Sequence, residues 1–334
     1  MRYDLNDIKY YTIQSQKIKA RITNYGCTLL NLFVTDSNGN EKDVVLGYEN
    51  IEDYFNNPPC FGSCVLPCAN RIANAKFTLN GKEYTLDKND GENDLHSGNE
   101  PLHKRLWEFK SSDDYSVTFS ISSKNGDMGF PGNRDYTLTY KIHDNRLCIE
   151  YTCVSDADTL FNPTNHSYFN LLGHDSGEIY NHELTINAST FTPSDEHSIC
   201  HGDITDVKGT PMDFTTPTKI GERINEEYDQ LIWGNGYDHN YILNGNSSIP
   251  AATLTAPDNS LTLNIYTTAP CLQLYSGNYL SSNDIGKDGH HYSPRSGVAL
   301  ETQFAPNAIN VDRFIKPILN KGEQGYSCSI YEFI

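Results

Sequence analysis

Seven polar residues of this 334-residue chain have the types needed to move protons or to bind hydroxyl groups. Each lies in a stretch that resembles a loop or a strand end. Glu301 is unusual, because it follows the apolar run Val298-Ala299-Leu300 and precedes Gln-Phe-Ala-Pro, a setting that does not suit a solvated face. The seven candidates are Asn70, Arg71, His96, His166, Asp238, Gln273 and Glu301.

Each candidate also has an ordinary structural interpretation, and residue chemistry alone does not choose between the two. Arg71 can form a structural ion pair, with Glu301 as its partner. The two histidines can be loop residues bound to backbone groups. Asp238 can form a turn.

Compact catalytic motifs are absent: the chain has no HExxH, no GxSxG and no glycine-rich phosphate loop before a helix. His290 and His291 are adjacent, so on a strand they would face opposite sides. Cys60, Cys64 and Cys68 are four residues apart, but Gly and Pro between them disfavour the helix that would align them. We therefore expect packed thiols there, and neither a metal nor a cofactor.

The elements that position these residues are predicted to be strands, because apolar and polar residues alternate along much of the chain. "FTLNGKEYTL" (77–86) has two alternating runs about an Asn-Gly pair, which is typical of a hairpin. Five further runs predict half-buried strands at 116–122, 136–142, 147–154, 183–189 and 260–268.

Helical signals are few. The apolar spacing over 220–232 predicts one amphipathic helix, and "IEDYF" after Asn50 predicts a single turn. Two long irregular stretches, 201–219 and 281–297, predict loops. No βαβ alternation and no linker is found, so the sequence predicts one all-β, antiparallel domain over residues 1–334.

The net charge and the cysteine content limit the classes of partner and the compartment that we expect for this protein. Lys and Arg total 25 against 43 Asp and Glu, a formal charge of −18, which argues against nucleic acid or an anionic membrane as partner. A neutral sugar meets no such penalty. There are nine cysteines, none in a CxxC pair, and no apolar amino-terminal segment or membrane span. We expect a cytoplasmic protein with free thiols.

Taken together, the candidates resemble the aldose 1-epimerase (galactose mutarotase) family. The resemblance extends over essentially the whole chain, in the order of the family's motifs. It is carried by "NRIANAKFTLNGKEYTL", "LHSG", "GDMGFPGN", "NPTNHSYFNL", "YDHNYIL", "LQLYSGNYL" and "ALETQFAPNAIN".

The resemblance implies a large antiparallel β-sandwich with few short helices and a sugar cleft on one face. It places the acid on His166 and the base on Glu301. It places sugar binding on Asn70, Arg71, His96, Asp238 and Gln273. In one departure, Leu66-Pro67-Cys68 replaces the segment that carries the family's first arginine.

The implied reaction needs two proton carriers, because ring opening removes a proton from the C1 hydroxyl and adds one to the ring oxygen. Rotation about C1–C2 and ring closure then yield the other anomer. We expect a free aldohexose such as glucose or galactose as substrate, and a monomer or homodimer. The alternatives are a 1-epimerase of a reducing disaccharide such as maltose, a phosphosugar epimerase, a glycoside hydrolase, and a non-catalytic sugar-binding module.

Overall fold

The computed structural model describes residues 3–245, 248–281, 283 and 285–334, and strands dominate it. Every pairing between its strands is antiparallel. No helix in these ranges is long and apolar enough to cross a membrane. The all-β, antiparallel prediction is confirmed.

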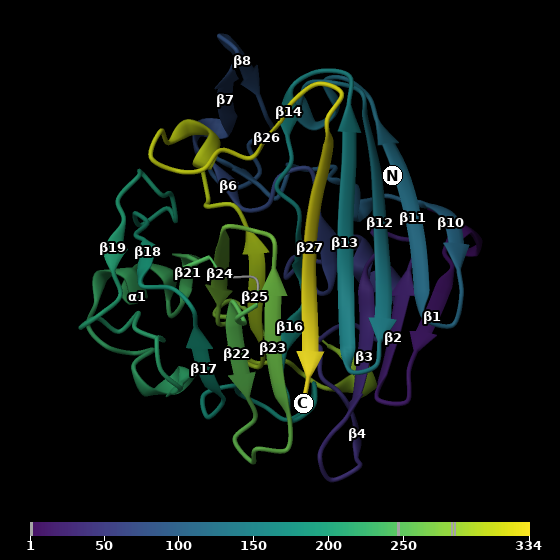
Figure 1. The fold of residues 1–334 in the computed structure, drawn as a ribbon, viewed down its shortest axis with the longest axis vertical. Coiled ribbons are helices and arrows are strands. Elements are labelled where there is room, and N and C mark those ends of the chain that lie inside the picture. The colour runs from purple at the N-terminus through teal and green to yellow at the C-terminus, as the bar shows by residue number, and fades with distance from the viewer. Residues whose placement is uncertain (1–2, 246–247, 282, 284) are drawn as a thin grey trace.

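A nine-stranded sheet lies across the front of the molecule in Figure 1. The burial of its long strands alternates residue by residue, as the sequence pattern predicts. In spatial order its strands are β10 (Glu108–Ser112), β11 (Ser116–Ser123), β12 (Arg134–His143), β13 (Arg146–Ser155), β27 (Gln324–Phe333), β23 (Thr262–Thr267), β22 (Ala252–Thr255), β17 (Glu183–Ile186) and β20 (Thr218–Lys219).

A six-stranded sheet packs behind it. The hydroxyl of Thr302 lies 2.5 Å from that of Ser329, and the rings of Phe169 and Tyr331 are 5.4 Å apart, which joins the two sheets. The six strands, in order, are β16 (Tyr168–Phe169), β25 (Val298–Gln303), β24 (Cys271–Tyr275), β21 (Asp238–Ile242), β18 (Thr190–Thr192) and β19 (Thr205–Asp206).

Shorter ladders complete the strand structure. One four-stranded sheet consists of β1 (Tyr10–Gln14), β2 (Ile18–Thr23), β3 (Leu29–Thr35) and β4 (Glu41–Asp43). The two-stranded ladders are β5 (Ser63–Val65) with β15 (Thr164–His166), β6 (Arg71–Ile72) with β9 (Asp94–Leu95), β7 (Lys76–Leu79) with β8 (Lys82–Thr85), and β14 (Thr159–Leu160) with β26 (Ile318–Leu319).

The predicted hairpin is the β7–β8 pair, with Asn80 at φ 53° and Gly81 at φ 75° in its turn. The five predicted strands are β11, β12, β13, β17 and β23, although β17 ends three residues earlier than expected. One contiguous core contains apolar side chains from both large sheets.

The prediction of one helix over 220–232 is wrong. A 3-10 turn occupies Ile220–Glu222, and α1 begins only at Asp229. The backbone N–H groups of Ile220 and Gly221 donate to the carbonyls of His182 and Tyr180, so tertiary contacts hold this segment. The helices are α1 (Asp229–Gly234) and the 3-10 turns η1 (Leu5–Asp7), η2 (Ile51–Asn56), η3 (Ala73–Ala75), η4 (Leu102–Lys104), η5 (Asp127–Gly129), η6 (Ile220–Glu222), η7 (Lys287–Gly289) and η8 (Ala308–Asn310).

Candidate functional site

A cavity of about 600 Å³ brings together residues from distant parts of the sequence. Six of the seven candidates line it. They are Asn70, Arg71, His96, His166, Asp238 and Glu301.

Glu301 lies on β25, a strand that is buried along its whole length. Its side chain is on the cleft side, whereas Thr302 contacts the facing sheet. Glu301 is only 2% exposed. Burial raises the pKa of its carboxyl well above the ordinary value; Asp238 adds to this effect and Arg71 opposes it. The carboxyl therefore holds a proton more readily than a solvated one.

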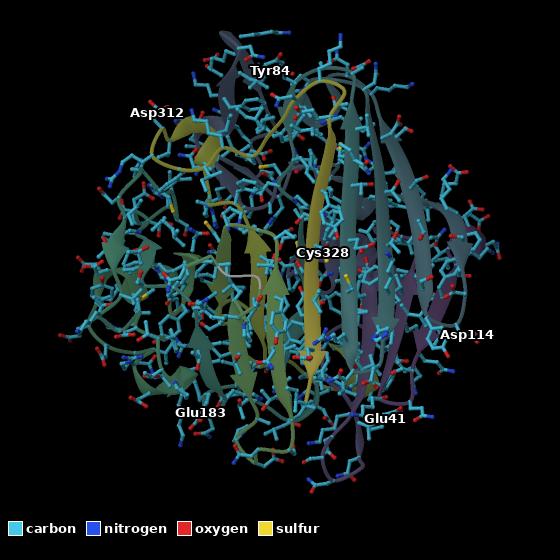
Figure 2. All side chains as sticks on the ribbon, viewed as in Figure 1. Glu41, Tyr84, Asp114, Glu183, Asp312 and Cys328 are labelled. Carbon is cyan, nitrogen blue, oxygen red and sulfur yellow. The ribbon has the colours of Figure 1, made fainter. Side chains whose placement is uncertain are left out.

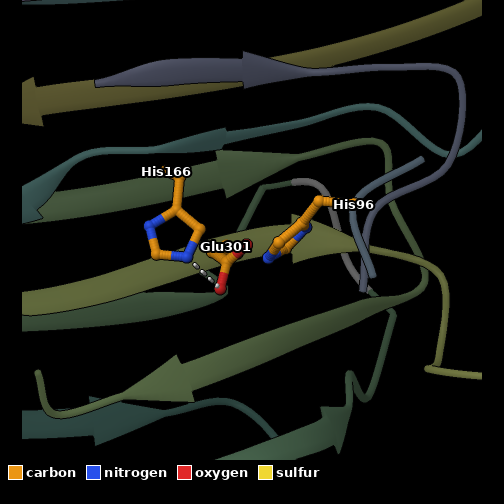
Figure 3. A group of neighbouring side chains, drawn as sticks. All are labelled: His96, His166 and Glu301. Carbon is orange, nitrogen blue, oxygen red and sulfur yellow. Dashed lines mark ion pairs between the residues drawn. The ribbon is translucent and has the colours of Figure 1, made fainter. Parts of the chain in front are cut away.

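His166 ends β15 and faces Glu301, as Figure 3 shows. Its Nε2 atom is 3.5 Å from Oε1 of Glu301, and both residues are nearly inaccessible to solvent. Burial lowers the pKa of His166 to about 4, and the charge of Asp238 acts in the opposite direction. Because burial favours the neutral form of both groups, the pair holds one proton that can lie on either partner.

His96 is fixed by a backbone contact. It lies in a turn with φ 52°, and its Nδ1 accepts a hydrogen bond of 3.2 Å from the N–H of Asn70. This bond leaves the ring proton on Nε2, so His96 can donate a hydrogen bond to a ligand. Burial lowers its pKa well below the usual value, and the neighbouring His166 adds to this shift. Its ring lies edge-on to that of His166, with centroids 5.4 Å apart.

Asn70 and Arg71 lie beside His96 because β6 pairs with β9, the strand that precedes the His96 turn. The Nε atom of Arg71 is 2.7 Å from a carboxylate oxygen of Asp90. The ion pair of Arg71 is therefore formed with Asp90, and not with Glu301 as the structural interpretation expected. This leaves Glu301 to face the cleft.

Asp238 and Gln273 form a second positioned pair. The Gln273 amide donates a hydrogen bond of 2.7 Å to Oδ1 of Asp238 from the adjacent strand β24. Gln273 is itself 3% exposed and is not among the residues that line the cavity. It therefore orients Asp238 in this structure, and a direct contact with a sugar stays a prediction.

Sequence reasoning missed several residues that line the same cavity. His103 and Lys104 come from η4, where "PLHKRLW" offered a further histidine as a signal. Burial lowers the pKa of His103 to about 3, so it is neutral at physiological pH. Cys60 and Tyr275 also line the cavity; from the sequence we expect a packed thiol at Cys60, and Tyr275 lies in the motif "LQLYSGNYL" but is not among the seven candidates.

Leu66, Pro67 and Cys68, the departure from the family pattern, are buried and do not line the cavity. The backbone N–H and carbonyl of Cys68 each form a 2.9 Å hydrogen bond with the hydroxyl of Ser97, next to His96. Through these two hydrogen bonds the segment holds the turn that contains His96 and Ser97.

Two polar atoms of this site have no hydrogen-bond partner within the described residues. Oε2 of Glu301 and Nδ1 of His166 are buried with no hydrogen-bond partner. Buried polar atoms usually bind protein groups, water, an ion or a ligand. Donor atoms of His96, His166 and Glu301 lie within 4.8 Å of one another, a spacing at which they could hold a divalent ion. Without an ion the same atoms offer one acid, one base and one neutral donor, and the expectation of no metal stays a prediction.

Comparison with known families and curated proteins agrees with this geometry. A family model described as "Aldose 1-epimerase" matches residues 9–331. The chain is 38% identical over 318 residues to the galactose mutarotase of Bos taurus, covering 95% of this chain and 91% of the relative. It is 37% identical to the aldose 1-epimerase of Escherichia coli K12, over 94% of this chain and 91% of that one.

Solved structures share the fold over the whole length. A GalM/aldose epimerase homologue from C. elegans superposes with a TM-score of 0.90 at 29% identity, covering 98% of this chain and 99% of the other. Galactose 1-epimerase from Lactobacillus acidophilus gives a TM-score of 0.87 at 28% identity, covering 100% of this chain and 96% of the other.

Proposed function

The chain belongs to the aldose 1-epimerase family, and on that premise we propose that it opens the ring of a free aldohexose such as glucose or galactose between Glu301 and His166. The observation that carries this proposal is the 3.5 Å contact between these two groups on the wall of the cleft. The C1 hydroxyl and the ring oxygen are bonded to the same carbon. Two groups this close therefore reach both oxygens together.

In the first step the proton shared by the pair moves from Glu301 to His166, which creates a carboxylate and an imidazolium. Asp238 favours the imidazolium electrostatically. Glu301 then takes the proton of the C1 hydroxyl while His166 gives one to the ring oxygen. His96, with its proton on Nε2, binds a sugar oxygen and positions the ring, as Asn70, Arg71 and Asp238 do from the other walls. After rotation about C1–C2 the roles reverse.

Polarimetry of freshly dissolved α-glucose and α-galactose tests this function. We expect the protein to accelerate the decay of optical rotation for at least one of them, and a strong chelator to leave the rate unchanged. No acceleration with any sugar would favour a binding module instead. Loss of rate on chelation, restored by zinc or manganese, would require a metal-dependent mechanism.

A reducing disaccharide is the second candidate, and a neighbouring cavity favours it. A second cavity of about 630 Å³ shares Arg71 with the first and is lined by the carboxylates of Asp90 and Asp195. Carboxylates there can accept hydrogen bonds from the hydroxyls of a second sugar unit. Acceleration with α-maltose that exceeds the acceleration with α-glucose would select this candidate.

A further inference from the structure

Two cysteines meet on the outer face of the nine-stranded sheet, away from the cleft. Cys148 on β13 and Cys328 on β27 are 180 positions apart in sequence, and their Sγ atoms are 3.1 Å apart. Cys328 lies opposite Glu150 in the ladder, so Cys148 is its diagonal neighbour on the same face. Figure 2 labels Cys328 on β27, between β13 and β23 of Figure 1.

This pair differs from the other cysteines. All nine cysteines lie in the described residues and all are free thiols. Among them, Cys148 and Cys328 form the one sulfur–sulfur hydrogen bond that the described residues contain. Cys64, by contrast, is fully buried, and its sulfur contacts the carbonyl oxygen of Cys27 and the hydroxyl of Tyr140. Cys148 is partly exposed and Cys328 is 7% exposed, so a reagent as small as peroxide can reach the pair from the side of Cys148.

The surroundings prepare one sulfur to react. The hydrogen bond from Cys148 lowers the pKa of the Cys328 thiol; burial opposes this shift, and Tyr326 and Lys141 add to it. Glu150 opposes this shift, but it is itself paired with Lys141. A thiolate supported by a neighbouring thiol is the reactive form of cysteine.

A metal ion is the other ligand that these groups could take, because donor atoms of Cys148, Glu150 and Cys328 lie within 4.8 Å of one another. Tetrahedral zinc with Zn–S bonds of about 2.3 Å separates two sulfurs by about 3.8 Å. The observed 3.1 Å lies between this value and the roughly 2.05 Å of a disulfide bond. The carboxylate of Glu150 is paired with Lys141, which leaves two sulfur ligands where structural zinc takes four, and this favours a bond between the sulfurs.

We propose that Cys148 and Cys328 form a peroxide-sensitive dithiol that closes reversibly into a cross-strand disulfide. The Cys328 thiolate attacks one oxygen of hydrogen peroxide, breaks the O–O bond and becomes a sulfenic acid, with hydroxide as leaving group. The Cys148 sulfur then attacks that sulfur and displaces the oxygen, which leaves as water with the proton of the Cys148 thiol. Two thiols and one peroxide thus give one disulfide and two waters. A small dithiol reverses the reaction.

Mass spectrometry after peroxide treatment and alkylation of the denatured protein tests the proposal. We expect the free-thiol count to fall from nine to seven, the intact mass to fall by about 2 Da, and one crosslink joining residues 148 and 328. Dithiothreitol should restore all nine thiols. Because the bond closes a long loop, the unfolding midpoint of the oxidised protein should rise by about 3–6 °C.

Single-cysteine substitutions identify which of the two cysteines reacts with peroxide and which closes the disulfide. Cys148→Ser and Cys328→Ser should each abolish the crosslink, and Cys148→Ser should leave a sulfenic acid on Cys328 that dimedone traps. Cys153→Ala is the matched control, because Cys153 lies on the same strand but faces the core, and it should crosslink normally. Nine remaining thiols, oxygen adducts without a crosslink, or a bond between other cysteines would overturn the proposal.

Discussion

At the scale of single residues, the proposed chemistry depends on two buried groups whose usual pKa order burial reverses. The carboxyl of Glu301 holds its proton more tightly than usual, and the ring of His166 holds one less tightly. A pair that shares one proton always contains one acid and one base. This suits a reaction in which the two roles exchange halfway, and it predicts a rate that falls both when the pair gains a second proton and when it loses its only one.

Glu301→Gln tests the base directly. The amide keeps the size of the side chain and can still contact a hydroxyl, but it cannot accept the proton, so kcat should fall by about 10² or more while KM changes little. The unfolding midpoint should stay near that of the wild type, because Arg71 keeps its partner Asp90. Glu183→Gln, at an exposed position, is the control. A variant that melts early yet keeps its rate would make Glu301 a structural residue and move the search for the base to Asp238.

The two histidines should differ in their effects. His166→Asn removes the proposed proton donor, so it should lower kcat by about 10² or more. His96→Asn removes a neutral hydrogen-bond donor, so it should mainly raise KM. Steady-state kinetics on both variants separates these effects. The assignment of the acid must be exchanged if His96→Asn has the larger effect on kcat.

At the scale of elements, two-stranded ladders position several of the cleft residues. β6 with β9 carries Arg71 and leads into the turn at His96, and β5 with β15 carries His166. The pairing of β6 with β9 brings Arg71 beside Leu95, so that the turn at His96 and Ser97, with φ of 52° and 72°, directs a ring into the cleft. This conformation is unfavourable for residues other than glycine. The hydroxyl of Ser97 holds it by bonding both backbone groups of Cys68.

Ser97→Ala should therefore lower the stability of the protein and weaken sugar binding, because it loosens the turn that holds His96. Loss of the hydroxyl leaves the buried N–H and carbonyl of Cys68 without their partner, which should cost about 1–3 kcal/mol of stability. Because the His96 turn loosens, KM should rise more than kcat falls. Denaturant unfolding and kinetics measure the two effects. Ser112→Ala, at an exposed position on β10, should change neither, and an unchanged KM in Ser97→Ala would separate the turn from sugar binding.

At the scale of the whole molecule, burial makes folding sensitive to acid. The pKa values of His166, His182 and His239 are lowered to about 4, and that of His103 to about 3, in each case mainly by burial. The unfolded chain regains an ordinary pKa of about 6.5 for each. Between these values each of these histidines binds more protons in the unfolded state than in the folded state, whereas the carboxyls of Glu301 and Asp94, whose pKa values burial raises, act in the opposite direction. The histidines are the larger group, so stability falls as the pH falls through this window.

We expect the free energy of unfolding to fall steeply between about pH 6.5 and pH 4, with each buried histidine contributing up to about 1.4 kcal/mol per pH unit. His182 lies outside the cleft, where its Nε2 accepts a hydrogen bond from the N–H of Leu171. His182→Gln keeps an acceptor but does not titrate, so it should reduce the slope by about that amount. Denaturant unfolding across the pH range checks this, and a slope equal to that of the wild type would show that His182 does not contribute.

Some features of this protein are determined by the sequence alone. Alternating residues predict β11, β12, β13 and β23, since a half-buried strand must place every second side chain in the core. The Asn-Gly pair predicts the β7–β8 hairpin, because these residues adopt positive φ at low cost. Glu301 stands out because a carboxyl that follows an apolar run on a strand is not expected to face solvent. The family motifs predict which residues belong together.

Other features are decided only by tertiary structure. The segment 220–232 has the spacing of a helix, but the N–H groups of Glu226 and Tyr228 donate to the carbonyls of Arg223 and Glu226, so the regular i→i−4 ladder is broken before α1 begins at Asp229. No local pattern reveals that Arg71 pairs with Asp90, that Gln273 lies behind Asp238, or that Cys148 meets Cys328. These contacts join residues 19 to 180 positions apart. Their partners are chosen by strand register and burial, which exist only once the sheets have packed.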